Sequence, residues 1–408
     1  MTKTILVIGT YDTKNDELSY LCQTIIKQGG AVISMDVSVL GNPMEKTDIS
    51  KHDVAAAAGK TIEDVINAGD ENLAMQIMAA GASAMTTQLY AEGKIDAMVG
   101  LGGSMGTDLV LDCCQALPLG MPKYVVSTIA FSPLIPPERL SPDVQMILWA
   151  GGLYGLNSIC KSSLSQAAGA VLGAAQAVEP PVGKRPLIGM MSLGSSCLKY
   201  MTYLQKPLEE RGFEVAVFHA TGMGGMAFEA LARQHHFVCV LDLALPEISN
   251  LMVGSVANAG TDRLTNAGLA GIPQIISPGC ADLIDFAGWQ DIPDPYKDRP
   301  FHAHNRLIKS AGLSSDERRA VIRDIAARLA TAKGAVKFVM PLKGIEEWDQ
   351  EGEPAYDPDG LAAMIDEVRQ VLSTYLVEID AHINSQAYAD LILQLVDEWV
   401  EAGVIKTS

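Results

Sequence analysis

Short apolar runs alternate with amphipathic stretches along most of this chain. Residues 4–9 have the pattern of a buried strand, and residues 14–28 place apolar side chains at helical spacing. A glycine pair ends that helix, and residues 31–37 return to a strand pattern. Strand, helix and strand in this order predict a βαβ unit, and therefore a parallel sheet.

The order continues and then begins again after residue 186. The first part predicts a helix, two strands and a helix at residues 70–92, 95–99, 124–128 and 162–177. Paired prolines in residues 179–186 interrupt any helix and predict a linker. Beyond it, strand, helix and strand patterns recur at residues 187–191, 199–210 and 214–218.

This repetition predicts an α/β fold of two related Rossmann-like domains, each a doubly wound parallel sheet. We place the domains at residues 1–180 and 186–408. Ligands of such sheets bind beyond the carboxyl ends of the strands. We therefore expect a ligand cleft between the two domains.

The C-terminal part is less regular. The pattern predicts strands at residues 336–345 and 375–379, and a helix at 361–372 with Asp359 as a candidate N-cap. An amphipathic helix at residues 386–401 either packs back on the core or forms a dimer contact. Residues 277–305 are the least regular part, and a long irregular loop favours a functional role.

The glycine-rich loop at residues 100–107 is the strongest candidate site. It follows an apolar strand, precedes a helix, and carries Gly100, Gly102, Gly103 and Gly106. Glycines let the backbone approach a ligand closely, and the N-terminus of the helix offers unpaired N–H groups. This geometry suits a phosphate. Ser104 and Thr107 add hydroxyl donors.

The loop after the first strand is a second candidate. It contains Thr10, Asp12, Thr13 and Lys14. Lys14 can neutralise phosphate charge, and Asp12 can hold Mg²⁺ directly or through water. The alternative is structural: Thr13 caps the helix, and Asp16 completes a capping box.

A third glycine cluster follows the strand at residues 214–218. We expect it to face the first glycine loop across the cleft, with four residues near the ligand: Thr221, Gly222, Gly224 and Gly225. His219, at the end of the strand, is either a functional group or a packed loop residue.

Two motifs leave other chemistries open. Residues 102–106 satisfy G-x-S-x-G, the nucleophile elbow of serine hydrolases, with Ser104 as nucleophile. Its triad partners would come from Asp242 or Asp285 with His302 or His304. The additional glycines Gly100 and Gly103 favour phosphate approach instead. The pair His302 and His304 also offers a metal or ligand contact, but lacks a clear third zinc ligand; the alternative is that Asn305 caps a helix at residues 306–311.

Charge and cysteine content narrow the function classes. The net charge of −18, from 30 basic and 48 acidic residues, argues against nonspecific binding to nucleic acids or anionic membranes. The seven cysteines lack paired spacing, which favours buried free thiols in a reducing cytoplasm. No apolar run predicts a signal peptide or a membrane span.

Several separated motifs together resemble a known family. They are I-G-T-Y-D-T-K at 8–14, G-L-G-G-S-M-G-T at 100–107, H-A-T-G-M-G-G at 219–225, His304-Asn305, and V-E-I-D-A-H-I-N at 377–384. The chain resembles the ATP-binding domain family of the tomato mosaic virus resistance protein, which consists mostly of uncharacterised bacterial proteins. The resemblance implies two Rossmann-like domains, ATP at the domain cleft, and a homodimer. It also implies that His304 and Asn305 contact the ligand.

Three functions stay open at this point. The first is an ATP-binding protein that performs Mg²⁺-dependent phosphoryl or adenylyl transfer to a small metabolite. The second is a nucleotide-sensing or regulatory module without turnover. The third is a serine hydrolase that uses Ser104.

Overall fold

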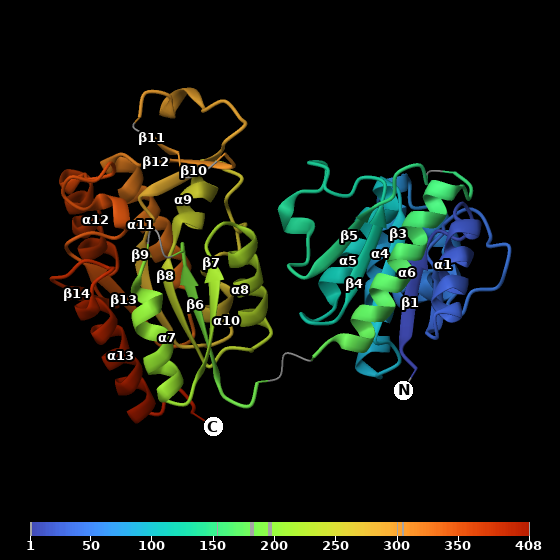
Figure 1. The fold of residues 1–408 in the computed structure, drawn as a ribbon, viewed down its shortest axis with the longest axis horizontal. Coiled ribbons are helices and arrows are strands. Elements are labelled where there is room, and N and C mark those ends of the chain that lie inside the picture. Colours follow the sequence, from blue (N-terminus) through green and yellow to red (C-terminus); the bar gives the residue numbers. More distant parts are fainter. Residues whose placement is uncertain are drawn as a thin grey trace. The chain divides into compact units, whose positions relative to one another are not determined.

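The computed structural model describes residues 2–152, 154–179, 183–194, 198–299, 301–303 and 306–407. The chain forms two compact units, Met1–Pro181 and Val182–Ser408 (Figure 1). The boundary between the units falls inside the linker predicted at residues 179–186.

One parallel sheet, with strands in the order β2-β1-β3-β4-β5, forms the centre of the first unit. The strands are β1 (Thr4–Gly9), β2 (Ala31–Asp36), β3 (Ala97–Gly102), β4 (Lys123–Ser127) and β5 (Val144–Leu148). The helices are α1 (Asn15–Lys27), α2 (Lys51–Ala57), α3 (Ile62–Ile66), α4 (Glu71–Ala91), α5 (Ser104–Ala116), the short η1 (Pro137–Arg139) and α6 (Ser158–Ala177). From β1 the chain adds β2 on one side and then crosses to β3 on the other.

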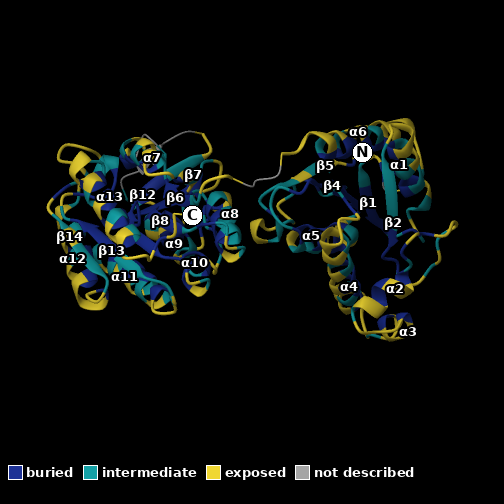
Figure 2. Ribbon diagram, turned by 90° about the horizontal axis from the view of Figure 1, so that it is seen from below, coloured by how far each residue is buried: buried dark blue, intermediate teal, exposed yellow. Residues whose placement is uncertain are grey.

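Alternate side chains of β1 are buried on opposite faces of this sheet. Leu6 and Ile8 pack in one cluster with side chains of α2, α4 and α5, whereas Ile5 and Val7 pack in another with α1 and α6. Because helices cover both faces, the strands read as continuous apolar runs in the sequence. Figure 2 shows the resulting dark-blue strand β1 within the first unit.

The second unit repeats this winding in a larger parallel sheet, with the order β14-β13-β9-β8-β6-β7. Its strands are β6 (Leu187–Ser192), β7 (Glu214–His219), β8 (Cys239–Ala244), β9 (Gln274–Gly279), β13 (Val336–Pro341) and β14 (Leu376–Ile379). From β6 the chain adds β7 on one side and then crosses to β8. The predicted α/β class with two doubly wound parallel sheets is therefore confirmed.

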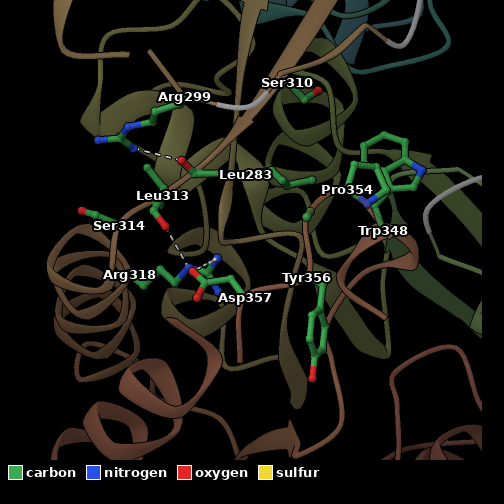
Figure 3. Close-up of a pocket in the computed structure, with 12 residues that line it drawn as sticks. Leu283, Arg299, Ser310, Leu313, Ser314, Arg318, Trp348, Pro354, Tyr356 and Asp357 are labelled. Atoms are coloured by element: carbon green, nitrogen blue, oxygen red, sulfur yellow. Dashed lines mark hydrogen bonds and ion pairs between the residues drawn. The ribbon is translucent and has the colours of Figure 1, made fainter. Parts of the chain in front are cut away.

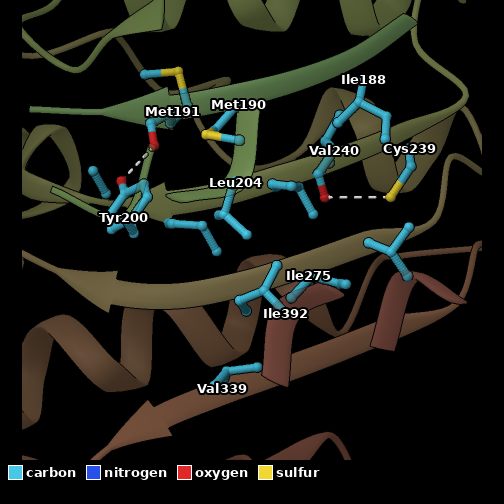
Figure 4. Close-up of a cluster of buried hydrophobic side chains, with 14 of the residues drawn as sticks. Ile188, Met190, Met191, Tyr200, Leu204, Cys239, Val240, Ile275, Val339 and Ile392 are labelled. Atoms are coloured by element: carbon cyan, nitrogen blue, oxygen red, sulfur yellow. Dashed lines mark hydrogen bonds between the residues drawn. The ribbon is translucent and has the colours of Figure 1, made fainter. Parts of the chain in front are cut away.

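Helices flank this second sheet. They are α7 (Tyr200–Glu210), α8 (Met223–Arg233), α9 (Pro246–Met252), α10 (Asn266–Leu269), η2 (Asp294–Tyr296), α11 (Ser315–Leu329), η3 (Glu347–Asp349), α12 (Pro358–Val371) and α13 (Gln386–Glu401). Side chains of β6, β8, β9 and β13 pack in one cluster with side chains of α7 and α13; Met190, Tyr200 and Ile392 are among those drawn in Figure 4. Buried residues of α13, including Val396 and Trp399, belong to the same cluster. Of the two roles predicted for this helix, the structure shows packing against the core.

An antiparallel sheet lies between β9 and β13 in the sequence. It pairs β10 (Leu283–Ala287), β12 (Ile308–Gly312) and β11 (Phe301–Ala303), in the order β10-β12-β11. The prediction of a helix at residues 306–311 is therefore wrong, because most of these residues belong to β12. The N-cap prediction for Asp359 is also wrong. The side chain of Asp357 accepts the Gly360 N–H at 2.9 Å, and Pro358 occupies the first helical position, which suits a residue without an N–H.

Candidate functional site

The candidate site lies where the winding of the first sheet reverses. Strands β1 and β3 are neighbours, but the chain leaves β1 toward β2 and leaves β3 toward β4. The loops after β1 and β3 therefore diverge, and open α/β sheets bind ligands at such a point. Two candidate loops were predicted in this unit, the glycine-rich loop at residues 100–107 and the polar loop that contains Lys14. Both begin here.

A pocket of about 650 Å³ opens at this point. Eight of the predicted residues line it: Thr10, Asp12, Thr13, Lys14, Gly102, Gly103, Ser104 and Gly106. The structure thus brings together two loops that are almost 90 residues apart in the sequence. The volume of this pocket is in the range of small-molecule sites.

The N-terminus of α5 faces this pocket without a charged cap. Gly103 is the N-cap residue, no side chain in the described part of the chain caps the helix, and its first turn contains no acidic residue. The first hydrogen bond of the helix runs from Thr107 N to Gly103 O at 2.8 Å. The preceding N–H groups and the positive end of the helix dipole remain available to an anion.

The four glycines of this loop have two different roles. A Cβ on Gly100 would overlap the Val110 side chain, and one on Gly102 would lie 2.6 Å from the Gly106 Cα, so both permit close packing of α5. A Cβ on Gly103 or Gly106 would meet no atom closer than 3.8 or 3.5 Å. Packing therefore explains Gly100, which we had attributed to phosphate approach, but does not explain Gly103 or Gly106.

The loop after β1 turns on a single carbonyl. Thr10 O accepts the N–H groups of Thr13 and Lys14 at 3.2 and 2.9 Å, and the Thr10 and Thr13 hydroxyls lie 3.0 Å apart. The capping box proposed for Thr13 is wrong, because Lys14 is the N-cap of α1 and no side chain of the described residues caps this helix. The Lys14 ammonium lies 5.9 Å from the centre of the Trp149 ring.

Asp12 is held from two sides but keeps one free oxygen. Its N–H donates to the Ser38 hydroxyl at 3.1 Å, and its Oδ2 accepts the Gly41 N–H at 3.1 Å. Its Oδ1 is buried, with no hydrogen-bond partner in the part of the chain that is described. An orphaned carboxylate oxygen suits a metal ion, although among these described residues no cluster of three or more metal-binding side chains surrounds it.

Thr107 does not line the pocket, contrary to the prediction. Its side chain is only 1% exposed, and its hydroxyl lies 2.7 Å from the Ser127 hydroxyl inside the core. It lies in the first full turn of α5, where a step of about 100° per residue turns its side chain toward β4.

The remaining wall of the pocket was not predicted. It consists of apolar side chains and of polar groups around the start of α4, together with Met105 of α5: Val39, Leu40, Ile66, Asn67, Gly69, Asp70, Glu71, Ala74, Met75 and Met105. Asp70 caps α4 by accepting the Leu73 N–H at 2.7 Å. The sequence signal for this wall was the N-cap at Asp70, directly ahead of the long helix.

The second glycine cluster is built differently. It follows β7, an edge strand, and not β8, which corresponds to β3 in the winding. The Glu247 carboxylate, fully buried, accepts the N–H groups of Gly222 and Gly225 at 2.6 and 3.2 Å. A side chain at Gly225 would collide with this carboxylate. The amides that we expected to meet a ligand therefore bind a carboxylate of the protein itself.

Glu247 belongs to a buried charged cluster. Arg263, which is fully buried, donates from Nε to Glu247 at 2.6 Å and pairs with Asp242, and Glu229 lies 3.5 Å away. Burial raises the pKa of Glu247, and the Arg263 guanidinium opposes that rise. Burial likewise raises the pKa of Glu229 to about 7. Asp242, one of the residues considered for a hydrolase triad, is thus engaged as an ion-pair partner.

Other predicted residues of the second unit contact each other. The Thr221 hydroxyl lies 3.3 Å from His219 Nδ1, and a Cβ on Gly224 would overlap His219 O. His304 and Asn305 lie outside the described residues.

The geometry around Ser104 differs from a nucleophile elbow, whose serine sits on a strained turn. Ser104 is the first residue of α5 and is absent from the described non-glycine residues with positive φ. His52, the only histidine in the first 181 residues, lies exposed on α2 and does not line the pocket.

No helix in the described ranges is long and apolar enough to cross a membrane.

Two solved structures have a weak likeness to the chain, the glycosyltransferase SnogD and MurG. SnogD from Streptomyces nogalater matches 97% of this chain and 99% of its own at 12% identity, with a TM-score of 0.20. MurG of Acinetobacter baumannii matches 98% of this chain and all of its own at 13% identity, with a TM-score of 0.21.

Sequence relatives extend over nearly the whole chain. A UPF0261 protein of Brucella melitensis biotype 1 is 53% identical over 98% of this chain and 96% of its own, and one of Clostridium tetani is 34% identical over 95% and 97%. The tomato protein described as ToMV resistance protein Tm-1(GCR237) is 27% identical over 97% of this chain and 55% of its own.

Two family models match in succession. The N-terminal domain of the uncharacterised protein family UPF0261 matches residues 3–180, and its C-terminal domain matches residues 185–400. The chain therefore belongs to the UPF0261 family.

Proposed function

We propose that the pocket of the first unit binds ATP together with Mg²⁺. The observation that carries this proposal is the uncapped N-terminus of α5, which shares the pocket with the loop of Lys14. Free amides, a helix dipole and a lysine together favour a phosphate chain. The family resemblance supports ATP as the particular nucleotide.

The lining suggests how the nucleotide lies. Its phosphates face Gly103, Ser104 and Lys14, because these supply the N–H, hydroxyl and ammonium donors. Its base lies against the apolar wall that includes Ile66 and Met75. The carboxylates of Asp70 and Glu71 are then the acceptors for ribose hydroxyls, a role acidic residues often have in such folds.

Asp12 is the residue that would hold the metal. Its Oδ1 lacks a protein partner among the described residues, and Mg²⁺ is commonly bound by one or two carboxylates together with phosphate oxygens. Mg²⁺ bound there supplies neutralisation of phosphate charge. The carboxylate oxygens of Asp12 thus fit this metal.

For the reaction, we propose transfer of a phosphoryl or adenylyl group to a small metabolite. Transfers of this class depend on positioning and charge neutralisation and need no nucleophilic triad. The alternative is a nucleotide-sensing module without turnover. Consumption of ATP in the presence of a panel of organic acids and sugars distinguishes the two.

The serine hydrolase alternative makes a separate prediction. A nucleophilic Ser104 would react with a fluorophosphonate probe, and the label would disappear in Ser104→Ala. We expect no labelling, because Ser104 lies in a regular helical turn without a histidine partner in this pocket.

The decisive experiment compares Lys14→Ala with Lys27→Ala by calorimetric titration of ATP and adenosine with Mg²⁺ present. Lys27 lies at the opposite end of α1 and is exposed, so it serves as the matched control. We expect Lys14→Ala to weaken ATP binding about tenfold or more, while adenosine binding changes little. Absence of ATP binding to folded wild-type protein would refute the proposal.

We further propose that the protein is a cytoplasmic homodimer. The homodimer rests on the family resemblance, and the compartment on the seven cysteines without paired spacing. Sedimentation equilibrium measures the first directly: a monomer mass across the concentration range would overturn it.

A further inference from the structure

The second unit contains a pocket that the nucleotide proposal does not use. It has a volume of about 340 Å³ and lies beside the antiparallel sheet. Figure 3 shows Arg299 and Arg318 on one side of it and Trp348 and Pro354 on the other. Its lining comes from β10, from Arg299 ahead of β11, from residues between β12 and the start of α11, and from residues between β13 and α12.

Arg318 is a buried cation with donors to spare. Its side chain is 4% exposed. Its Nε donates to Leu313 O at 3.0 Å, and its two terminal nitrogens lie 3.4 Å from Asp282 and 3.0 Å from Asp357. A guanidinium has five N–H groups, and these three contacts involve one on each nitrogen, which leaves Arg318 the capacity to donate to a ligand as well.

Arg299 repeats this arrangement at the rim. It binds the Glu317 carboxylate through both terminal nitrogens, at 2.8 and 3.1 Å, and also donates to Gly312 O. Its guanidinium stacks on Tyr296, at 4.5 Å from the ring centre. These contacts use its terminal nitrogens and not its Nε. The polar side of the pocket is therefore rich in donors.

The opposite side is apolar. Trp348, Pro354, Ala355 and Tyr356 form it, with Leu283 nearby. A donor-rich side facing an apolar side selects a ligand with acceptors at one end and an apolar body. The small volume restricts this ligand to a small metabolite.

Acidic groups behind Arg318 limit the ligand's charge. Asp282 and Glu346 are almost completely buried, and each has one carboxyl oxygen without a hydrogen-bond partner among the described residues. Burial raises the pKa of both carboxyls; Arg318 opposes the rise at Asp282, while the charge of Asp282 adds to it at Glu346. With Asp282 and Asp357 so close, a second negative charge on the ligand would be repelled.

We propose that this pocket binds a small organic monocarboxylate, with its carboxylate on Arg318 and Arg299 and its apolar body against Trp348. Planar guanidinium groups bind carboxylates through paired hydrogen bonds, which gives the selectivity. No residue lines both this pocket and the candidate nucleotide pocket. The two proposals therefore stand or fall separately.

The test titrates the full chain, without nucleotide, with phenylacetate, isovalerate, phenylacetamide and inorganic phosphate, and follows ligand saturation-transfer NMR. We expect saturable binding of at least one of the two carboxylates. Phenylacetamide, which has the same body without the charge, and phosphate should bind at least about tenfold more weakly. Failure of both carboxylates to bind, or tighter binding of phosphate, would overturn the proposal.

Variants then locate the binding. Arg318→Gln should weaken carboxylate binding about tenfold or more, whereas Arg323→Gln, on the same helix but paired with Glu367, should not. Ala355→Phe fills the pocket without removing a charge and should abolish binding even if Arg318→Gln fails to fold. Unchanged binding in Ala355→Phe would contradict the proposed site.

Discussion

Two glycine-rich loops in this molecule look alike in sequence and differ in structure. Both begin a helix, α5 in the first unit and α8 in the second. At α5 the first-turn amides meet a pocket, whereas at α8 the amides of the N-cap Gly222 and of Gly225 in the first turn meet the buried carboxylate of Glu247. A helix N-terminus attracts a negative charge in both places. At α8 the protein itself supplies this charge, whereas at α5 a ligand can supply it.

Glycine spacing thus indicates that another group comes close to the backbone. It does not indicate which group that is. At Gly225 the close neighbour is an internal carboxylate, and at Gly100 it is the Val110 side chain. Only Gly103 and Gly106 are glycines of the first loop without such a neighbour. Under the proposed function, these two residues are therefore the ones that leave room for the ligand.

The largest expected effect comes from removing the internal carboxylate. Glu247→Ala leaves Arg263 buried without one of its partners and two amides without an acceptor, so it should lower the free energy of unfolding of the second unit by about 3–5 kcal/mol. Urea unfolding followed by circular dichroism measures it.

Two controls accompany this change. Glu210→Ala removes only an exposed pair with Lys206 at 3.8 Å and should cost less than about 0.5 kcal/mol. Sodium acetate should restore part of the stability of Glu247→Ala more than sodium chloride at equal ionic strength. A loss below about 1 kcal/mol would mean that the carboxylate does not hold the second loop.

The next effect separates packing glycines from ligand glycines in the first loop. Gly100→Ala should destabilise the first unit by about 1–3 kcal/mol, because its methyl group overlaps Val110. Gly106→Ala should leave stability unchanged or raise it by up to about 1 kcal/mol, since it lies in a helix and has room. It should nevertheless weaken ATP binding about tenfold, because the methyl group narrows the approach to the amides. Thermal unfolding and calorimetry together test this; unchanged affinity in Gly106→Ala would remove the distinction.

The smallest effect concerns the pH response of the second unit's internal acids. Because the pKa of Glu346 is raised in the folded state, the folded protein keeps a proton that the unfolded chain loses above about pH 4.5. Stability from this group is thus complete below that pH and is lost as the pH rises toward the folded pKa. We compare the free energy of unfolding of Glu346→Gln with that of wild type at each pH. This difference should therefore favour the variant by about 1–2 kcal/mol more at pH 8 than at pH 4.5.

Urea midpoints at the two pH values measure this gain. Glu353→Gln, an exposed acid in the same loop, should show no such pH-dependent difference. An equal response of the two variants would mean that Glu346 ionises normally in the folded protein.

Local patterns in the sequence were enough to predict most of the parallel strands and most of the long helices, whereas α11 was not predicted. The run at residues 4–9 and the amphipathic face of residues 386–401 both became the elements expected. The antiparallel sheet was missed because β10 pairs with β12, more than 20 residues further along the chain. Short helices such as α2 and α3 carry too few turns for a clear period.

The candidate site was predictable where it follows strands. Thr10 and Ser104 stand directly beyond β1 and β3, and neighbouring strands of a parallel sheet end at the same edge. The apolar wall at Ile66 and Met75 was missed, because apolar residues on a helix read as core. Glu247 was missed since it lies 22 residues from Gly225 and only the fold brings them together.

The position of Lys14 above the Trp149 ring has an optical consequence. Trp149 is the only tryptophan of the first 181 residues, and Trp348 lines the pocket of the second unit. An anion that draws the Lys14 ammonium away alters the field on one indole, while a ligand resting against Trp348 alters the surroundings of the other. Each of these two tryptophans can thus serve as a local fluorophore, once the other three of the chain's four tryptophans are replaced by phenylalanine.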